Sequence, residues 1–463
     1  MSGTTQLKRQ IGLFSAIAIV VANMVGTGIF TTSGFILKEV QHPYALLYCW
    51  LIGGIFALCG ALCYGELGAR YPQAGGEYVY LRESFGRQVA FLSGWISLIV
   101  GFSAPIAAGS IAFAAYLLRA MAIDAPESYS LSIGQVKIFS VSLPIATAIA
   151  VVAALSLLHC YSLRWGRRAQ NMFTLFKIAL LAGFIAAGLR KTGGSIRHVP
   201  DTFSAASLLD GKFAVALIFV SFAYSGWNAA AYLGGEVRRP VRNLPMALWV
   251  GTLIVLSLYL LLNWLYLCAL APGKMKGVLD VGALAAFELF GTGIGRWFSA
   301  GVALGLISVL SAMILTGPRV YYAMSRDRIF FPLFGRVHIS RYTPVYAIGL
   351  QGAIAVIMIV TATYDKLLIY IGFTLSLSAM VTVIGLIRLR LKRHDPTGGY
   401  RTWGYPVTPL IFILGNLWII WFSIKNQPLP ALYGVATIAT GWLVGSCFKN
   451  RLNHAGTPKM NTG

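Results

Sequence analysis

Charged residues are scarce in this chain of 463 residues. They make up 11% of the sequence, and only 14 of them are Asp or Glu, whereas hydrophobic residues make up 57%. A soluble protein of this length needs more polar surface than that, while apolar runs of about 20 residues are long enough to cross the hydrocarbon core of a bilayer. The composition therefore excludes a soluble protein and indicates a polytopic membrane protein.

The motifs of catalysis and metal binding are also missing. No nucleophile elbow, phosphate-binding loop or His/Cys/carboxylate cluster is present, and the GxG motifs precede no predicted strand. The six cysteines lack C-x-x-C spacing and lie within or at the ends of apolar runs, which predicts free, buried thiols: Cys49, Cys59, Cys63, Cys160, Cys268 and Cys447. We therefore expect no enzymatic activity, no cofactor and no metal.

The apolar runs predict twelve transmembrane helices. The first run follows Lys8 and Arg9 as a signal peptide would, but it has no small-residue cleavage site and continues through Ile29 and Phe30, so we predict a retained span. The twelve predicted spans are 12–39, 43–70, 87–119, 138–160, 167–189, 213–236, 243–270, 296–325, 343–363, 366–390, 406–425 and 428–448.

The net charge of +23 raises the possibility of nucleic-acid binding. The basic residues, however, flank the predicted spans, and the alternation of loops places most of them on the side of the N-terminal tail, which the positive-inside rule assigns to the cytoplasm. There they can also meet anionic lipid headgroups. We predict a membrane-lipid contact, no nucleic-acid partner, and cytoplasmic N- and C-termini. The main clusters are Arg164/Arg167/Arg168, Arg238/Arg239/Arg242 and Arg388/Arg390/Lys392/Arg393.

The spans divide into two halves of similar length, each with an odd number of helices, as in inverted repeats that pack around a central site. We expect an all-α membrane protein with a 5+5 inverted repeat and discontinuous helices 1 and 6. Its predicted parts are a cytoplasmic tail (1–11), the first repeat (12–189), an external connector (190–212), the second repeat (213–390), a cytoplasmic loop (391–405), helices 11 and 12 (406–448) and a cytoplasmic tail (449–463). A weakly amphipathic stretch, Val281–Leu289, predicts an external helix over the entrance.

Glycines interrupt the first span at Gly26-Thr27-Gly28. They let the chain leave helical geometry, so that the backbone N–H groups of Thr27, Gly28 and Ile29 begin a second half-helix whose positive end favours a carboxylate. A close helix-packing site of small residues would give the same pattern.

A matching break lies in the sixth span at Ser225-Gly226-Trp227-Asn228. The half-helix that ends there leaves the carbonyl groups of Phe222, Ala223 and Ser225 without partners, and Asn228 adds a side-chain donor and acceptor. One break thus supplies donors and the other acceptors, which suits the carboxylate and amino groups of an amino acid. Met24, beside the first break, completes the predicted substrate site.

Five motifs in order, between about residues 10 and 395, resemble those of the amino acid–polyamine–organocation superfamily, and its L-type amino acid transporter branch in particular. They are Asn23-Met24-Val25-Gly26-Thr27-Gly28-Ile29-Phe30, Gly65-Glu66-Leu67-Gly68 with Pro72-Gln73-Ala74-Gly75-Gly76-Glu77-Tyr78-Val79-Tyr80, Phe222-Ala223-Tyr224-Ser225-Gly226-Trp227-Asn228 with Gly235-Glu236-Val237, Arg242-Asn243-Leu244-Pro245, and Ser325-Arg326-Asp327 with Tyr342-Thr343-Pro344-Val345. The resemblance implies a LeuT-like fold, amino acid substrates and alternating access.

Lys177 lies about ten residues into the fifth span, near the bilayer centre, where a lysine is costly and indicates function. The run Gln170–Lys177 resembles the fifth helix of that superfamily. This likeness implies that the lysine reaches the first-helix break and takes the place of a coupling sodium ion. Ser308 and Ser311 are candidate hydroxyl partners. A lysine that snorkels to the membrane surface is the alternative.

Other charged residues read as structural. Glu66 and Arg70, and Glu236 beside Arg238 and Arg239, are predicted to form ion pairs at helix ends or contacts of an inner gate, and not to bind the substrate. All acidic residues can be placed near helix ends or in loops, so none is expected to meet a cationic substrate side chain.

The sequence therefore favours a sodium-independent transporter of neutral L-amino acids, by exchange or proton-coupled symport. A non-transporting sensor on the same fold, and a carrier of cationic amino acids or polyamines, remain open. The superfamily members that carry a heavy chain have a cysteine between spans three and four, whereas the stretch from Met121 to Val136 has none, and no N-x-S/T sequon occurs. We expect a bacterial inner-membrane permease without a disulfide-linked heavy chain.

Overall fold

The computed structural model describes residues 9–73, 75–123, 129–133, 136–161, 166–196, 203–326, 329–336, 343–392 and 399–454. Some predicted features lie outside these residues: most of the N-terminal tail, the last nine residues of the C-terminal tail, Ala74, Arg164, Asp327, Tyr342 and Arg393.

The described part of the chain is almost entirely helical. Its first half contains α1 (Leu13–Met24), α2 (Thr27–Thr31), α3 (Ser33–Val40), α4 (Pro43–Arg70), α5 (Glu77–Phe85), α6 (Arg87–Ile96), the π-helical η1 (Ser97–Ser103), α7 (Ala104–Met121), strands β1 (Tyr129–Ile133) and β2 (Val136–Val141), α8 (Leu143–Tyr161) and α9 (Gly166–Thr192).

The second half opens with the short η2 (Ala205–Leu209). It continues with α10 (Gly211–Tyr224), α11 (Ala229–Tyr232), η3 (Gly234–Glu236), α12 (Pro240–Ala269), α13 (Pro272–Met275), α14 (Val281–Arg326), η4 (Pro332–Gly335), α15 (Val345–Thr361), α16 (Tyr364–Lys392), α17 (Val407–Asn426) and α18 (Pro428–His454).

Within the described residues, nine helices are long and apolar enough to cross a membrane, and α10 and α15 are shorter apolar helices. The chain is therefore a multi-pass membrane protein. The predicted first span corresponds to α1–α3, the third to α6–α7 and the sixth to α10–η3. The stretch predicted as an external helix forms the start of α14, set off from the rest by Gly291, which has a φ of 79°.

An antiparallel hairpin of β1 and β2 is the exception to the all-α prediction. Polar and apolar residues alternate along β1, Tyr-Ser-Leu-Ser-Ile, with the period of a strand. The hairpin also shortens the predicted fourth span at its start, because β2 takes up residues 136–141 and α8 begins only at Leu143.

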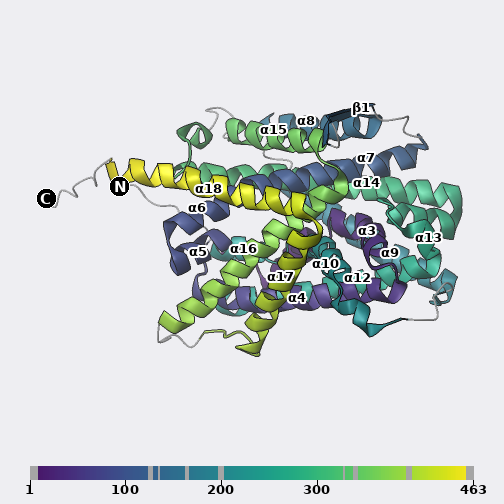
Figure 1. Ribbon diagram of the computed structural model, residues 1–463, viewed down its shortest axis with the longest axis horizontal. Coiled ribbons are helices and arrows are strands. Elements are labelled where there is room, and N and C mark those ends of the chain that lie inside the picture. Colours follow the sequence, from purple (N-terminus) through teal and green to yellow (C-terminus); the bar gives the residue numbers. More distant parts are fainter. Residues whose placement is uncertain are drawn as a thin grey trace.

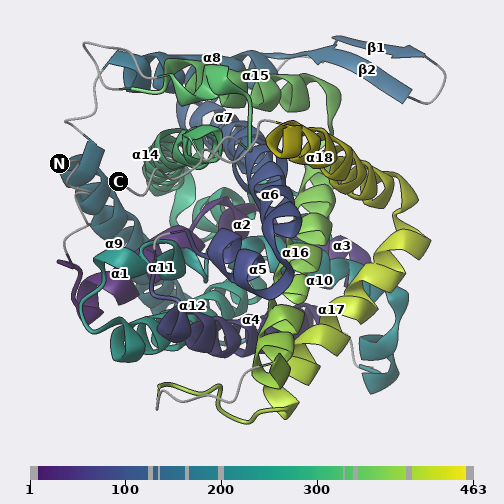
Figure 2. The same cartoon turned by 90° about the vertical axis from the view of Figure 1, so that its left-hand side faces the viewer.

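The long helices run along one axis of the molecule, with α5 near one end and α13 near the other (Figure 1). Viewed along that axis, from the end that carries α5, α2 lies near the centre, enclosed by α4, α12, α14, α16 and α6 (Figure 2). Helices α8 and α15 pack together as an outer layer, while α17 and α18 cover another side. The broken helices therefore lie in the interior.

Both predicted breaks are confirmed. Helix α1 ends at Met24 and α2 begins at Thr27, while α10 ends at Tyr224 and α11 begins at Ala229. In the second break, Gly226 has a φ of +94°, a left-handed conformation that glycine adopts without a Cβ clash. The cysteines are free as predicted, but Cys447 is exposed and Cys160 only partly buried.

Candidate functional site

The two breaks lie against each other in the core. A Cβ atom built on Gly28 would be 2.4 Å from the Cα atom of Ala223, and one built on Gly226 would be 3.0 Å from the carbonyl oxygen of Asn23. Each break thus presents a glycine to the backbone of the other. Only residues without a side chain permit so close an approach.

The first break supplies backbone donors. The N–H groups of Thr27, Gly28 and Ile29 open α2, where the first turn has no acceptor within the helix, and the N-cap residue Gly26 offers no side-chain cap. All three residues are buried. The hydroxyl group of Thr31 donates to the carbonyl oxygen of Thr27 at 2.9 Å and so fixes this short turn.

The second break supplies acceptors, but two of the three predicted carbonyl groups already have partners. The carbonyl oxygen of Phe222 accepts a hydrogen bond from the N–H group of Ser225 at 3.0 Å. That of Ala223 accepts from the hydroxyl group of Tyr259 at 3.2 Å. The same hydroxyl lies 2.6 Å from the carbonyl oxygen of Met24, so Tyr259 on α12 bridges the two breaks.

The side chain of Asn228 points to Glu77, the first residue of α5. Its Nδ2 atom donates to Oε1 of Glu77 at 2.9 Å. The same oxygen accepts from the hydroxyl group of Tyr64 at 2.8 Å, and Oε2 accepts from Ser378 at 3.3 Å. Glu77 lies at a helix end, as predicted for the acidic residues, and it contacts the second break through Asn228.

Lys177 is buried, with 3% of its surface exposed, and its Nζ atom donates to the carbonyl oxygen of Ala22 at 3.1 Å. The lysine thus reaches the first helix just before its break. Its two candidate hydroxyl partners behave differently: Ser311 lies 2.8 Å from Nε2 of His159, and Ser308 is buried with no hydrogen bond among the described residues. The stem of Lys177 packs at Gly305, one turn from Ser308 on the same face of α14.

The two sides of the first break differ in packing. On the α3 side, Ser33 donates to Asn263 at 2.6 Å, Tyr364 donates to Thr31 at 2.8 Å, and Gly277 donates to the carbonyl oxygen of Gly34 at 2.8 Å. On the α1 side, several residues are exposed: Phe14, Ser15, Ala18 and Asn23. The part of the first span that follows the break is therefore packed more tightly than the part that precedes it.

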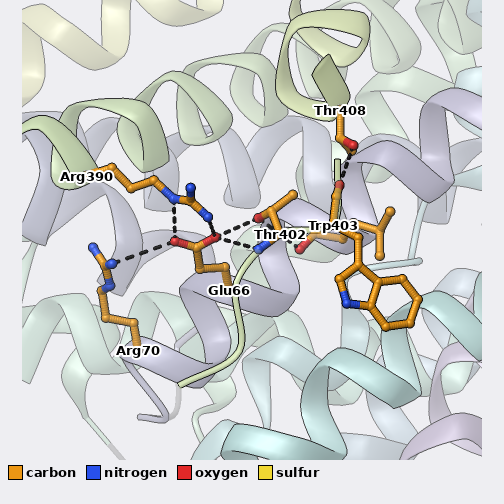
Figure 3. A network of polar contacts seen from close by, with 7 residues as sticks. Glu66, Arg70, Arg390, Thr402, Trp403 and Thr408 are labelled. Atoms are coloured by element: carbon orange, nitrogen blue, oxygen red, sulfur yellow. Dashed lines mark hydrogen bonds and ion pairs between the residues drawn. The ribbon is translucent and has the colours of Figure 1, made fainter. Parts of the chain in front are cut away.

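A buried ion pair fastens the helices around the site (Figure 3). The predicted pair of Glu66 and Arg70 is present at 3.6 Å, but the main partner of Glu66 is Arg390 on α16, whose Nε donates at 2.8 Å and whose terminal nitrogen also contacts the carboxylate. The backbone N–H group of Thr402 donates to the same carboxylate at 2.8 Å. Glu66 therefore ties α4, α16 and the segment before α17 together.

The predicted ion pair of Glu236 is wrong. Its side chain forms no ion pair among the described residues, whereas its backbone carbonyl oxygen accepts hydrogen bonds from Gln10 and Ile11 at 2.8 and 2.9 Å. Ile11 in turn accepts from the N–H group of Arg238 at 2.9 Å. Backbone hydrogen bonds, and not an ion pair, hold Gln10 and Ile11 against Glu236 and Arg238.

Tyr259 and Glu77 are contacts of the site that the sequence motifs do not predict. Tyr259 is a polar residue in the middle of an apolar span, which is a recognisable signal. Glu77 belongs to the motif Gly75-Gly76-Glu77, which served only as a mark of resemblance.

Comparison with known proteins agrees with this geometry. Residues 11–446 match the amino acid permease family. The large neutral amino acids transporter small subunit 2 of Mus musculus is 29% identical over 95% of this chain and 81% of its own length. The b(0,+)-type amino acid transporter 1 of Mus musculus is 30% identical over 95% of this chain and 87% of its own. The serine/threonine exchanger SteT of Bacillus subtilis is 29% identical over 89% of this chain and 91% of its own.

These matches span nearly the whole chain, including both broken helices, and the family consists of transporters and not of enzymes. Two glycine breaks in contact, a buried lysine on α9 that reaches the first helix, and a family match from residue 11 to residue 446 lead to one conclusion: the chain is an amino acid transporter of the amino acid–polyamine–organocation superfamily, similar to its L-type branch.

Proposed function

We propose that the protein carries neutral L-amino acids across the membrane without sodium, by alternating access. The contact between the two breaks is the observation on which this proposal rests. Free N–H groups at Thr27, Gly28 and Ile29 suit a carboxylate, and the carbonyl groups of Ala223 and Ser225 with the amide of Asn228 suit an ammonium group. An α-amino acid carries both groups on one carbon atom.

The proposed architecture is a LeuT-like fold with twelve spans, in which five helices are repeated in inverted orientation and two helices follow. The family match implies this fold. The breaks in α1–α2 and α10–α11 support it, because discontinuous helices at matching positions of two repeats form the binding site of such carriers. With a cytoplasmic N-terminus, α1 is the half of the first span that lies toward the cytoplasm.

The proposed role of Lys177 is that of a fixed cation in place of a coupling ion. Its Nζ atom contacts the carbonyl oxygen of Ala22, where a cation can neutralise the carbonyl groups at the end of α1. The hydroxyl groups of Ser308 and Ser311 stay proposed partners during the transport cycle. Because the protein already supplies this positive charge, we expect no requirement for sodium.

A carrier of cationic amino acids is the second candidate, and Glu77 is the observation that favours it. A carboxylate one residue away from the substrate could receive a positive side chain. Both of its oxygens, however, already accept hydrogen bonds from neutral donors, and Asn228 lies between it and the break. We therefore keep neutral amino acids as the preferred class.

Uptake into proteoliposomes tests the proposal. The purified protein, reconstituted without any partner chain, should take up labelled alanine, serine or leucine equally well with sodium or potassium outside. Internal amino acid should accelerate uptake if the protein is an exchanger, and an imposed pH gradient should drive uptake into empty vesicles if it is a proton symporter. Competition by lysine together with inert alanine, serine and leucine would favour the cationic carrier.

A sensor would give a different result. It would bind amino acids, detected as a rise in melting temperature, but would not move them under any gradient. Strictly sodium-driven uptake would overturn the assignment of Lys177. Activity of the single chain in vesicles would support a self-sufficient permease of a bacterial inner membrane, without a disulfide-linked heavy chain.

A further inference from the structure

A turn of two glycines holds Glu77 next to the second break. Gly75 and Gly76 have φ values of +128° and +50°, which glycine adopts without penalty, and a Cβ on Gly76 would lie 2.8 Å from the ring of Tyr232 on α11. The turn therefore brings α5 against α11 more closely than other residues allow. Glu77 follows it directly, so its carboxylate is aimed at the residue that caps α11, Asn228.

No cation pairs with this carboxylate among the described residues. Its hydrogen-bond donors are Tyr64 on α4, Asn228 and Ser378 on α16, and the other titratable groups that face it are the phenols of Tyr80 on α5 and Tyr232 on α11. Glu77 is thus not part of an ion pair such as that of Glu66. Its contacts are with neutral groups that it can orient.

The carboxylate determines which end of the Asn228 amide faces it. Oε1 of Glu77 accepts two hydrogen bonds, from Tyr64 and from Asn228, so the amide nitrogen and not the amide oxygen must point to it. A proton taken up by Glu77 would sit on Oε2, which faces the hydroxyl of Ser378 at 3.3 Å, and a hydroxyl can accept as well as donate. The orientation of the amide is therefore the same in both protonation states.

The other end of the amide is left open. Among the described residues, Oδ1 of Asn228 receives no hydrogen bond, and it is not enclosed by the protein. An oxygen in this position accepts but cannot donate. A hydroxyl group can donate one hydrogen to it but is neutral, whereas an ammonium group has three hydrogens and a positive charge, so the ammonium group forms the stronger bond with this oxygen.

We propose that Glu77 is a positioning residue: it fixes the Asn228 amide so that the oxygen faces the substrate, and thereby makes the carrier select an α-amino group over an α-hydroxyl group. This proposal rests on the proposed function, because it takes Asn228 as part of the amino acid site. It adds a residue from α5, outside the broken helices, to the determinants of substrate choice.

Competition between alanine and its α-hydroxy analogue lactate tests the proposal. In Glu77→Leu, which has no acceptor, the amide is free to turn, and alanine should lose at least about tenfold in affinity because a hydrogen bond to a charged group is lost. Lactate should lose much less, so the ratio of the two affinities falls. Glu77→Gln keeps an acceptor oxygen and should keep the ratio. A purely structural role of Glu77 would weaken both ligands alike.

Ser378→Ala is the matched control, since it removes a donor to the same carboxylate without contacting Asn228. It should leave the ratio unchanged. Affinities are measured as inhibition of alanine uptake and as the ligand-induced rise in melting temperature, which reports binding even where transport is slow.

A transposed pair tests the same idea without loss of size or charge. Asn228→Asp places two carboxylates face to face, so alanine uptake should fall at neutral pH and recover in acid, where the pair holds a proton. Glu77→Gln combined with Asn228→Asp exchanges the amide and the carboxylate, and should restore uptake at neutral pH. If the double variant transports no better than Asn228→Asp alone, Glu77 does not act through Asn228.

The outcomes separate the two proposals. Both proposals would be overturned if alanine, serine and leucine neither raised the melting temperature of the wild-type protein nor were taken up by vesicles that contain it. A wild-type protein that transports alanine, together with an unchanged affinity ratio in Glu77→Leu, would overturn the role of Glu77 and leave the proposed function standing.

Discussion

The contact between Gly28 and Ala223 gives a sharp prediction about the first break. In Gly28→Ala, the new Cβ atom would lie 2.4 Å from Cα and 2.7 Å from Cβ of Ala223. Carbon atoms in contact prefer about 3.5–4.0 Å, so α2 and α10 must separate by about 1 Å. Overpacking of this kind costs about 1–3 kcal/mol, and a displacement of about 1 Å in a site can lower a rate about a hundredfold.

Gly26 provides the matched control, although the same substitution there looks equivalent in the sequence. A Cβ atom on Gly26 would meet its nearest atoms at 3.7 Å or more, which is ordinary contact, and its φ of −114° suits other residues. We expect Gly28→Ala to lower alanine uptake between about tenfold and a hundredfold, and Gly26→Ala to change it by less than about threefold.

The assay is initial-rate uptake into proteoliposomes, normalised to the amount of protein that is inserted and monodisperse. Melting temperature in detergent, with and without alanine, separates loss of binding from loss of folding. Normal uptake by Gly28→Ala would refute the reasoning, because the two half-helices could then not lie as close as described. Equal damage from Gly26→Ala would show that the break, and not the contact with α10, is the sensitive feature.

Three further predictions concern charged groups. Lys177→Ala should lower the rate of uptake at least about tenfold while changing melting temperature little, and unchanged uptake would exclude a coupling role. Glu66→Ala should cost about 3 kcal/mol of stability, since it leaves Arg390 without its buried partner. Glu83→Ala, which removes an exposed ion pair, should cost at most about 1 kcal/mol. Similar melting temperatures for these two variants would contradict this prediction. Burial raises the pKa of Glu77 above 4.5, so between pH 4.5 and the raised pKa the folded state holds a proton that the unfolded chain has released, and stability should fall as pH rises through this range. The difference in melting temperature between Glu77→Gln and wild type should therefore grow across this pH range and stay constant above it. A difference that does not depend on pH would refute this prediction.

The sequence was sufficient for the main features of the fold. Glycines inside two long apolar runs predicted both breaks, because glycines in the interior of a transmembrane helix often mark a discontinuity that forms a binding site. The predicted fourth span begins too early because it includes part of the β1–β2 hairpin, although the alternating residues of that hairpin have the period of a strand.

The finer contacts of the site could not be predicted in the same way. Glu66 was paired with Arg70, four residues away, but its main partner, Arg390, is 324 residues away, and only the packing of α4 against α16 brings them together. The contact of Glu77 with Asn228 likewise joins residues 151 positions apart. Local spacing predicts neighbours on one helix, whereas contacts between helices depend on how the helices are placed and rotated.

The hydroxyl group of Tyr259 has only one hydrogen atom, yet two carbonyl oxygens, of Met24 and of Ala223, lie within reach of it. At any moment the hydrogen can be directed fully to only one of them. The carbonyl oxygen of Met24 also accepts a hydrogen bond from the N–H group of Gly26 at 2.7 Å, so the hydrogen of Tyr259 can turn to Ala223 without leaving Met24 unsatisfied. One hydroxyl group can therefore exchange its hydrogen bond between the ends of the two half-helices, and it links them through a bond that either end can release.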